Sequence, residues 1–215
     1  MRRFFRRFLI LFTAGVTLIC TLCGVWGVRA QSDLSSKVIR IHVIANSDSD
    51  ADQALKMEVR DRVLDLCETL ISGCTDRDSA ERILDARADE IQGVAKEAIA
   101  EAGYSYSVSS SLSCEFYPTR EYDSLRLPAG DYLSLRITIG AGDGKNFWCV
   151  LFPPICRSSA RADEELCEVG FTKSEVRLLT EEEDVHYVIK FKIVEVASSI
   201  KERLGSMFKK RGGDR

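Results

Sequence analysis

Histidine is scarce in this chain, which has two histidines, His42 and His186, among 215 residues. A multi-histidine metal centre needs more imidazole ligands than this, so such a centre is excluded. Cys-X-X-Cys pairs are also lacking after residue 30, and a zinc site of that type is not predicted. We therefore expect neither a metal nor a cofactor.

Charge is missing from a long stretch near the start of the chain. No charged residue occurs from Phe8 to Val28, and four arginines precede this run. About 18 or more uncharged, mainly apolar residues can span a bilayer as a helix, and the basic flank predicts a cytoplasmic N-terminus. The run ends in small residues around Ala30 that are compatible with cleavage. Residues 1–30 are thus predicted to export the chain, as a cleaved signal peptide or as a retained membrane anchor through residues 8–28.

Basic residues are a minority in the rest of the chain. The sequence has 30 basic and 33 acidic residues, and five of the basic residues but none of the acidic ones lie in residues 1–30. The remainder therefore carries an excess of eight acidic side chains. The negative net charge of this part argues against a nucleic-acid-binding protein and against a polybasic membrane-surface protein.

Six cysteines follow the export segment, and an even number in an exported domain favours disulfides over free thiols. The sequence leaves their pairing open. Cys149 and Cys156 are close in sequence and form the candidate disulfide. The six are Cys67, Cys74, Cys114, Cys149, Cys156 and Cys167.

Apolar periodicity predicts a strand and two helices in the first half of the chain. Residues 38–45 alternate apolar and polar side chains, as a half-buried strand does. Residues 51–71 repeat apolar side chains at helical spacing and end before Gly73. A second helix is predicted from residue 78 or 79 up to Gly103.

The second half is predicted to be mainly antiparallel sheet. Alternation indicates strands within 104–116 and 131–139, and the short apolar run at 147–152, ended by two prolines, indicates a third strand. Residues 157–174 are highly charged and indicate a solvated loop, and residues 185–208 have the spacing of an amphipathic helix. The fold class is therefore α+β.

The expected organisation is one extracytoplasmic domain with flanking segments. Residues 1–30 are the export segment and residues 31–37 a polar linker. Residues 38–167 are expected to form the domain, and residues 168–215 a C-terminal extension that contains the last helix.

Three carboxylates alternate along residues 48–52, as at the start of a calcium loop. The EF-hand then needs glycine at its sixth position and glutamate at its twelfth, where this chain has Gln53 and Val59. A calcium site is therefore not predicted. Capping of the following helix is favoured instead, by Asn46, Ser47 and Asp48.

His42 and the cysteines supply an alternative, catalytic interpretation. A cysteine-dependent hydrolase would use Cys149 or Cys156 as nucleophile and His42 as base. His42 would need a partner such as Asp48 or Cys149, if the fold brings one near. A disulfide would leave no thiolate to attack, and a structural histidine competes with this hypothesis.

Phe147 and Trp148 place two aromatic side chains next to each other. Such residues pack in cores, but they also dominate protein-binding surfaces. Both interpretations stay open at the level of sequence.

Three segments together resemble the stage II sporulation protein R family. They are RIHVIANSDSDADQALKMEVRD at 40–61, EFYPTREYDSLRL at 115–127, and LPAGDYLSLRITIGAGDGKNFWCVLFPPIC at 127–156. The resemblance covers about residues 38–156 and includes the export segment. It is weaker after Cys167.

The resemblance implies an exported intercellular signal of endospore-forming bacteria and not an enzyme. Such a protein is made in the forespore and exported into the space between the two sporulation membranes. There it triggers a membrane-bound aspartic protease of the mother cell, which removes the inhibitory pro-sequence from a sigma factor precursor. The residues expected to contact this partner, or to hold the shape of the contact, are His42, Asn46, Ser47, Asp48, Gln53, Lys56, Arg60, Asp61, Asn146 and Trp148.

Overall fold

The computed structural model describes most of the chain between residues 31 and 180. Among these residues no helix is long and apolar enough to cross a bilayer. The greater part of the predicted export segment, Cys156 and the helix predicted at 185–208 lie outside them. The described residues are 6–7, 12–15, 17–18, 21, 31–122, 125–154, 166 and 169–180.

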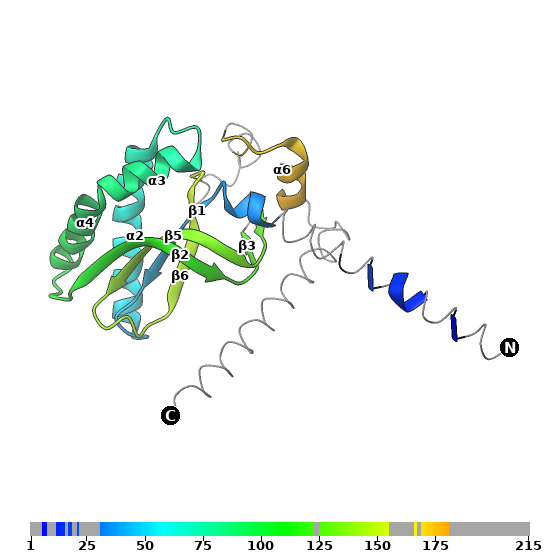
Figure 1. Ribbon diagram of the computed structural model, residues 1–215. Helices are drawn as coiled ribbons and strands as arrows, with labels where there is room; N and C mark the ends of the chain where they lie inside the picture. Colours follow the sequence, from blue (N-terminus) through cyan, green and yellow to red (C-terminus); the bar gives the residue numbers. More distant parts are fainter. Residues whose placement is uncertain are drawn as a thin grey trace, which may run out of the picture.

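Three helices are grouped after β1 and five strands follow them in succession, so the predicted α+β class is confirmed (Figure 1). The order differs from the predicted one, because two short strands and a helix occur that the sequence pattern did not indicate. The elements are β1 (Ile39–Ile44), α2 (Asp50–Ile71), α3 (Arg77–Ala86), α4 (Ala88–Glu101), β2 (Val108–Tyr117), β3 (Arg120–Tyr122), β4 (Leu125–Leu127), β5 (Gly130–Ile139), β6 (Asn146–Phe152) and α6 (Lys173–Thr180).

Four strands form one sheet in the order β2-β5-β1-β6, and β3 pairs with β4 in a separate hairpin. β5 pairs with β2 and β6 pairs with β1 in the antiparallel sense, but β1 and β5 are parallel. The prediction of an antiparallel sheet is therefore wrong at its centre. The long connection through α2, α3, α4 and β2 lets the chain return parallel to β1, which a short hairpin would not allow.

The helices α2, α3 and α4 cover one face of this sheet (Figure 1). Alternate residues of the central strands point into that core, which is why their sequences alternate. Ile41 and Val43 of β1, Ile137 of β5, and Val59 and Val63 of α2 are completely buried there.

The helix predicted from residue 78 or 79 to Gly103 is divided into two. Arg87 leaves the helical conformation with φ −112° and ψ 18°, and its N–H caps the end of α3. α3 begins after Asp76, whose carboxylate accepts a hydrogen bond of 2.8 Å from the N–H of Ser79. A cap of this kind satisfies one of the free N–H groups of the first turn.

A second, smaller core lies on the opposite face of the sheet. Leu34, from the helical turn at 31–35, packs there with residues of the β3–β4 hairpin and of α6. Leu166 and Phe171 are buried in this core, so the prediction of a solvated loop over 157–174 is wrong at these two positions. Lys37 and Glu175 join the two ends of this layer by an ion pair of 2.8 Å.

Arg40 of β1 lies fully buried in this second core. Its guanidinium carbon is 4.0 Å from the ring centroid of Tyr117, 5.2 Å from that of Tyr132 and 5.7 Å from that of Tyr122. Nη2 donates a hydrogen bond to the Tyr122 hydroxyl, while Nε and Nη1 have no hydrogen-bond partner among the described residues. The rings provide cation–π attraction, which strengthens when the cation is desolvated, but they do not satisfy all its N–H groups.

We predict that the packing of Arg40, rather than its charge, is what stabilises this core. Arg40→Met keeps most of the side-chain volume and removes the incompletely satisfied guanidinium, whereas Arg40→Ala leaves a cavity. The free energy of unfolding of Arg40→Ala should lie about 2–5 kcal/mol below that of Arg40→Met. Urea unfolding of both variants measures this difference, and equal losses in the two would show that the charge is the stabilising feature.

Candidate functional site

The carboxylate of Asp52 holds the turn between β1 and α2 in place through hydrogen bonds. Asp52 is 4% exposed and accepts hydrogen bonds of 2.9 Å from Nδ2 of Asn46 and 2.5 Å from Oγ of Ser47. The bonds from Ser47 and then Asn46 hold the pKa of Asp52 below its usual value, against the opposing effect of burial. A hydrogen bond with Tyr106 also acts in this direction. Asp52 is therefore ionised at neutral pH and anchors the turn.

The same turn is bonded to the loop between β5 and β6. Oδ1 of Asn46 accepts from the N–H of Ala141 at 3.0 Å, and Oδ1 of Asp48 accepts from the N–H of Lys145 at 2.7 Å. The carbonyl of Ala45 accepts from the N–H of Gly144 at 3.0 Å. We call these two bonded loops, residues 45–49 and 140–145, the loop junction.

Glycine is required where the two loops approach each other. A Cβ on Gly144 would lie 2.3 Å from the carbonyl oxygen of Ser47, closer than real Cβ contacts. The glycine-rich loop is thus explained by the close approach of two backbones.

The predicted capping of α2 by Asn46, Ser47 and Asp48 is wrong. Ser49 is the N-cap, and its side chain accepts from the N–H of Asp52 at 3.2 Å. The three preceding side chains bond elsewhere: Asn46 and Asp48 accept from the loop at 140–145, and Ser47 donates to Asp52.

Lys56 and Gln53 support the junction from the first turns of α2. Nζ of Lys56 donates to Oε1 of Gln53 at 2.6 Å and to the carbonyl of Lys145 at 3.0 Å. Nε2 of Gln53 donates to the carbonyl of Ser47 at 2.9 Å. Lys56 is 5% exposed, and burial lowers the pKa of its ammonium group. Both side chains therefore hold the shape of the site and offer little surface to a partner.

Arg60 lies one turn further along α2. Its guanidinium pairs with Asp61 at 2.6 Å and lies over the ring of Phe147, 4.7 Å from the centroid. The sequence-predicted pair of Arg60 and Asp61 is thus brought to the start of β6.

His42 lies on the opposite face of the sheet from the helices. Its Nδ1 is 3.1 Å from Oε2 of Glu115, and its Nε2 is 2.9 Å from Oδ1 of Asn146. The carboxylate of Glu115 also pairs with Arg136 at 3.2 Å. The ring of Trp148 lies beside that of His42, at a centroid distance of 5.6 Å. The imidazole is therefore held by its neighbours in a polar cluster.

The fold does not bring His42 and Cys149 together. Cys149 is directly opposite Ile41 in the β1–β6 pairing, whereas His42 is opposite Trp148. Side chains alternate between the two faces of a sheet, so Cys149 lies on the helix-covered face and His42 on the other. The histidine partners considered from the sequence, Asp48 and Cys149, are replaced by Glu115 and Asn146.

Cys149 is disulfide-bonded to a cysteine outside the described residues. The pairing with Cys156 therefore stays a prediction. Cys67, Cys74 and Cys114 are free thiols, so the general expectation of disulfides is wrong for these three. Cys67 is completely buried, and burial raises the pKa of its thiol to about 12, which keeps it protonated.

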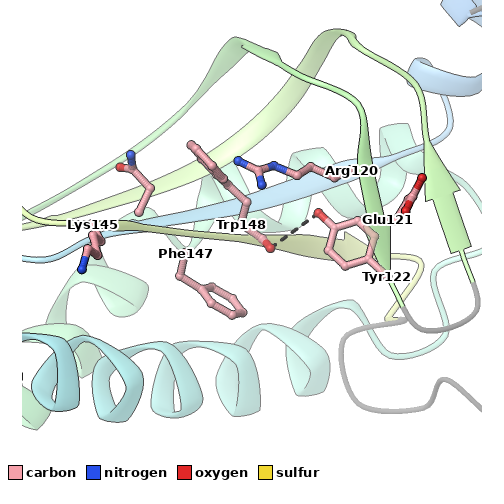
Figure 2. Close-up of a pocket in the computed structure, with 7 residues that line it drawn as sticks. Arg120, Glu121, Tyr122, Lys145, Phe147 and Trp148 are labelled. Atoms are coloured by element: carbon pink, nitrogen blue, oxygen red, sulfur yellow. Dashed lines mark hydrogen bonds between the residues drawn. The ribbon is translucent and has the colours of Figure 1, made fainter.

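A groove of about 550 Å³ runs between β6 and the β3–β4 hairpin (Figure 2). The guanidinium of Arg120 lies over the ring of Trp148, 4.3 Å from its centroid. The Tyr122 hydroxyl lies 3.5 Å from the Trp148 carbonyl and donates to it. The lining residues are Arg120, Glu121, Tyr122, Lys145, Asn146, Phe147 and Trp148.

Sequence reasoning identified Asn146 and Trp148 in this groove but missed the hairpin residues opposite them. Leu125 and Leu127 alternate with Arg126, but residues 120–122, Arg-Glu-Tyr, show no alternation of apolar and polar side chains. The intervening Asp-Ser also lacks the glycine that favours two-residue hairpin turns, so the sequence carries only a weak signal for this hairpin.

Comparison with known proteins now identifies the family. The family described as Stage II sporulation protein R (spore_II_R) matches residues 35–162. The chain belongs to the stage II sporulation protein R family. The loop junction and the groove both lie within the matched residues.

A curated relative agrees with this assignment. The chain is 40% identical over 123 residues to Stage II sporulation protein R of Bacillus subtilis (strain 168). The alignment covers 57% of this chain and 55% of the relative, so the chain spans little more than half the length of that protein. No solved structure matches the chain.

We predict that alanine at position 144 opens the loop junction. Gly144→Ala places a Cβ against the Ser47 carbonyl, so the two backbones must separate. The free energy of unfolding should fall by roughly 1–3 kcal/mol, and the melting temperature should fall by several degrees. Gly93→Ala is the matched control. Gly93 lies within α4 and has nothing within 4 Å of its added Cβ, so this variant should gain up to about 1 kcal/mol. Equal effects of the two substitutions in thermal unfolding would contradict the close approach.

Asp52 should make the stability of the domain sensitive to acid. Its folded-state pKa is lowered from 3.8, so its contribution is present above the unfolded-state pKa and is lost as pH falls through the lower folded-state value. Asp52→Asn should therefore be less stable than the parent at pH 7, and the gap should narrow below about pH 4. Urea unfolding at a series of pH values measures the gap. A gap that stays constant down to pH 3 would show that the charge of Asp52 is not involved.

Proposed function

We propose that this chain is an exported sporulation signal that activates a membrane-bound aspartic protease of the mother cell. The activated protease then processes the precursor of a mother-cell sigma factor. On this proposal the chain acts in the space between the two sporulation membranes, and residues 1–30 export it or anchor it there.

The single observation that carries the proposal is family membership over residues 35–162. These residues include the whole four-stranded sheet and the loop junction. A rigid junction beside an aromatic groove suits a protein that acts by presenting a surface, because rigid binding surfaces lose little conformational entropy on association.

The alternative function is a cysteine-dependent hydrolase, and the described geometry does not favour it. A nucleophile and its base must lie within hydrogen-bond reach, and Cys149 lies on the opposite face of the sheet from His42. Cys149 is also in a disulfide. Of the two nucleophiles considered from the sequence, Cys156 remains, and it lies outside the described residues.

Replacement of His42 separates the two functions. His42→Gln keeps a polar side chain between Glu115 and Asn146 but removes the only group there that could act as an imidazole base. Glutamine can keep the polar contacts by which His42 holds the shape of the site, so we expect processing of the sigma factor precursor to stay within about twofold of the parent. Loss of a general base would instead lower the rate about 100-fold or more. The measurement is the rate of precursor cleavage in cells that produce the protease, the precursor and either variant.

Thermal unfolding and co-purification with the protease are the controls for His42→Gln. If cleavage is lost while folding and binding to the protease are retained, the chain has a catalytic role and the proposed function is contradicted.

A further inference from the structure

β6 is an edge strand with one side unpaired among the described residues. It pairs with β1 on one side, and no other described strand follows it in the sheet. An edge strand presents a row of free N–H and C=O groups that can pair with another extended chain. The β3–β4 hairpin does not pair with this edge as a strand, because it forms a separate two-stranded sheet. It bonds to the backbone of β6 through the Tyr122 hydroxyl, which donates to the Trp148 carbonyl.

Aromatic side chains border this edge on both faces, and an arginine covers each of them. Trp148 and Phe147 point to opposite sides of β6 (Figure 2). Arg120 lies over Trp148 at 4.3 Å and Arg60 lies over Phe147 at 4.7 Å. An extended chain added to this edge would therefore meet aromatic surface on both sides, with the Arg120 guanidinium on the Trp148 side and the Arg60–Asp61 ion pair on the Phe147 side.

The two cations that line the groove lack acidic partners among the residues that the structure describes. No described carboxylate lies within 4.0 Å of the charged groups of Arg120 or Lys145. Nε of Arg120 is buried and has no hydrogen-bond partner among the residues described. The one acidic residue in the lining, Glu121, pairs with Arg126 at 3.1 Å. Unpaired positive charge at this groove stands out in a chain whose residues 31–215 are acid-rich.

We propose that the groove binds an extended, acidic segment of the partner as an additional strand on β6. This inference rests on the proposed function and specifies the part of the partner that is recognised. Backbone hydrogen bonds to the free edge would supply affinity, and alternate side chains would supply specificity. Arg120 and Lys145 would take carboxylates of the segment. Edge-to-edge pairing with a second copy of this chain is disfavoured, because it would bring the same cations together.

Short synthetic peptides test the proposal on the purified full-length chain. The first probe is a fluorescent eight-residue peptide that alternates threonine and glutamate, and the second has lysine in place of glutamate. Fluorescence anisotropy should show that the acidic peptide binds at least about tenfold more tightly than the basic one. One or two good contacts are enough for a tenfold difference in affinity. Equal binding of the two peptides would overturn the proposal.

Charge reversal locates the site. Arg120→Glu with Lys145→Glu should weaken binding of the acidic peptide at least about tenfold. The matched control carries the same charge change on the helical side, as Arg82→Glu with Lys96→Glu, and should bind within about twofold of the parent. Arg120→Gln with Lys145→Gln serves as a second test if charge reversal lowers the melting temperature. Binding unaffected by either pair of groove substitutions would overturn the proposal.

Two further measurements distinguish strand addition from simple charge contact. The bound acidic peptide should slow amide hydrogen exchange in residues 146–152, and methylation of alternate peptide nitrogens should weaken binding about tenfold. Exchange protection elsewhere, or full binding by the methylated peptide, would rule out strand addition. A dimer of the chain that is lost in the Arg120→Glu, Lys145→Glu variant would show that a second copy occupies the edge, and would also overturn the proposal.

The peptide experiments involve no protease, so they separate this inference from the proposed function. If the acidic peptide binds at β6 as expected but the chain does not trigger precursor processing, the proposed function fails and the binding site stands.

Discussion

The buried carboxylate of Asp52 is the interaction on which the rest of the candidate site depends. It fixes Asn46 and Ser47, and Asn46 in turn bonds to the loop at 140–145. That loop leads directly into β6. The hydrogen-bond network around Asp52, at the start of α2, therefore helps to position the free edge of that strand. A charged group can remain buried here because several donors satisfy its oxygens.

The two faces of the sheet differ in the side chains that pack on them. The face under α2, α3 and α4 forms the main apolar core, which explains the strict alternation of β1 and β5. The other face holds the cluster of His42 and Glu115, and next to it the buried Arg40 among three tyrosine rings. Tyr122 links Arg40 to the carbonyl of Trp148. The hairpin that forms one wall of the groove is thus attached to the core by an aromatic and cationic network.

Local patterns in the sequence predicted β1, α2 and β5 from their apolar periodicity, and predicted β6 from a continuous apolar run whose last four residues are buried on both faces of the sheet. They did not predict the parallel pairing of β1 with β5, since register between distant strands depends on the helices that connect them. Helix capping was assigned to Asn46, Ser47 and Asp48 because these residue types favour caps. The bonds of Asn46 and Asp48 to residues 140–145 could not be read from the sequence, because a polar side chain does not reveal whether its partner is local or distant.

The same limit explains why the bonding partners of the site residues could not be predicted from the sequence. Lys56 and Gln53 are expected to contact the partner or to hold the shape of the contact, and the sequence does not choose between these roles. The bond from Lys56 to the distant carbonyl of Lys145 and the burial of Lys56 decide for the second. The partners of His42 are 73 and 104 residues away in the chain, so no motif contains them. Family resemblance identified the segments that matter, and only the three-dimensional arrangement showed which of their side chains reach the groove.

The central claim is that the chain acts as a ligand through the groove along β6. Site-specific photo-crosslinking tests it most directly, with a photoreactive side chain placed at Glu121 in the groove or at Glu97 on the exposed side of α4, in cells that contain the protease. The account predicts a crosslink to the protease from position 121 and none from position 97. A crosslink from position 97 alone, or none from either position while precursor processing continues, would contradict it.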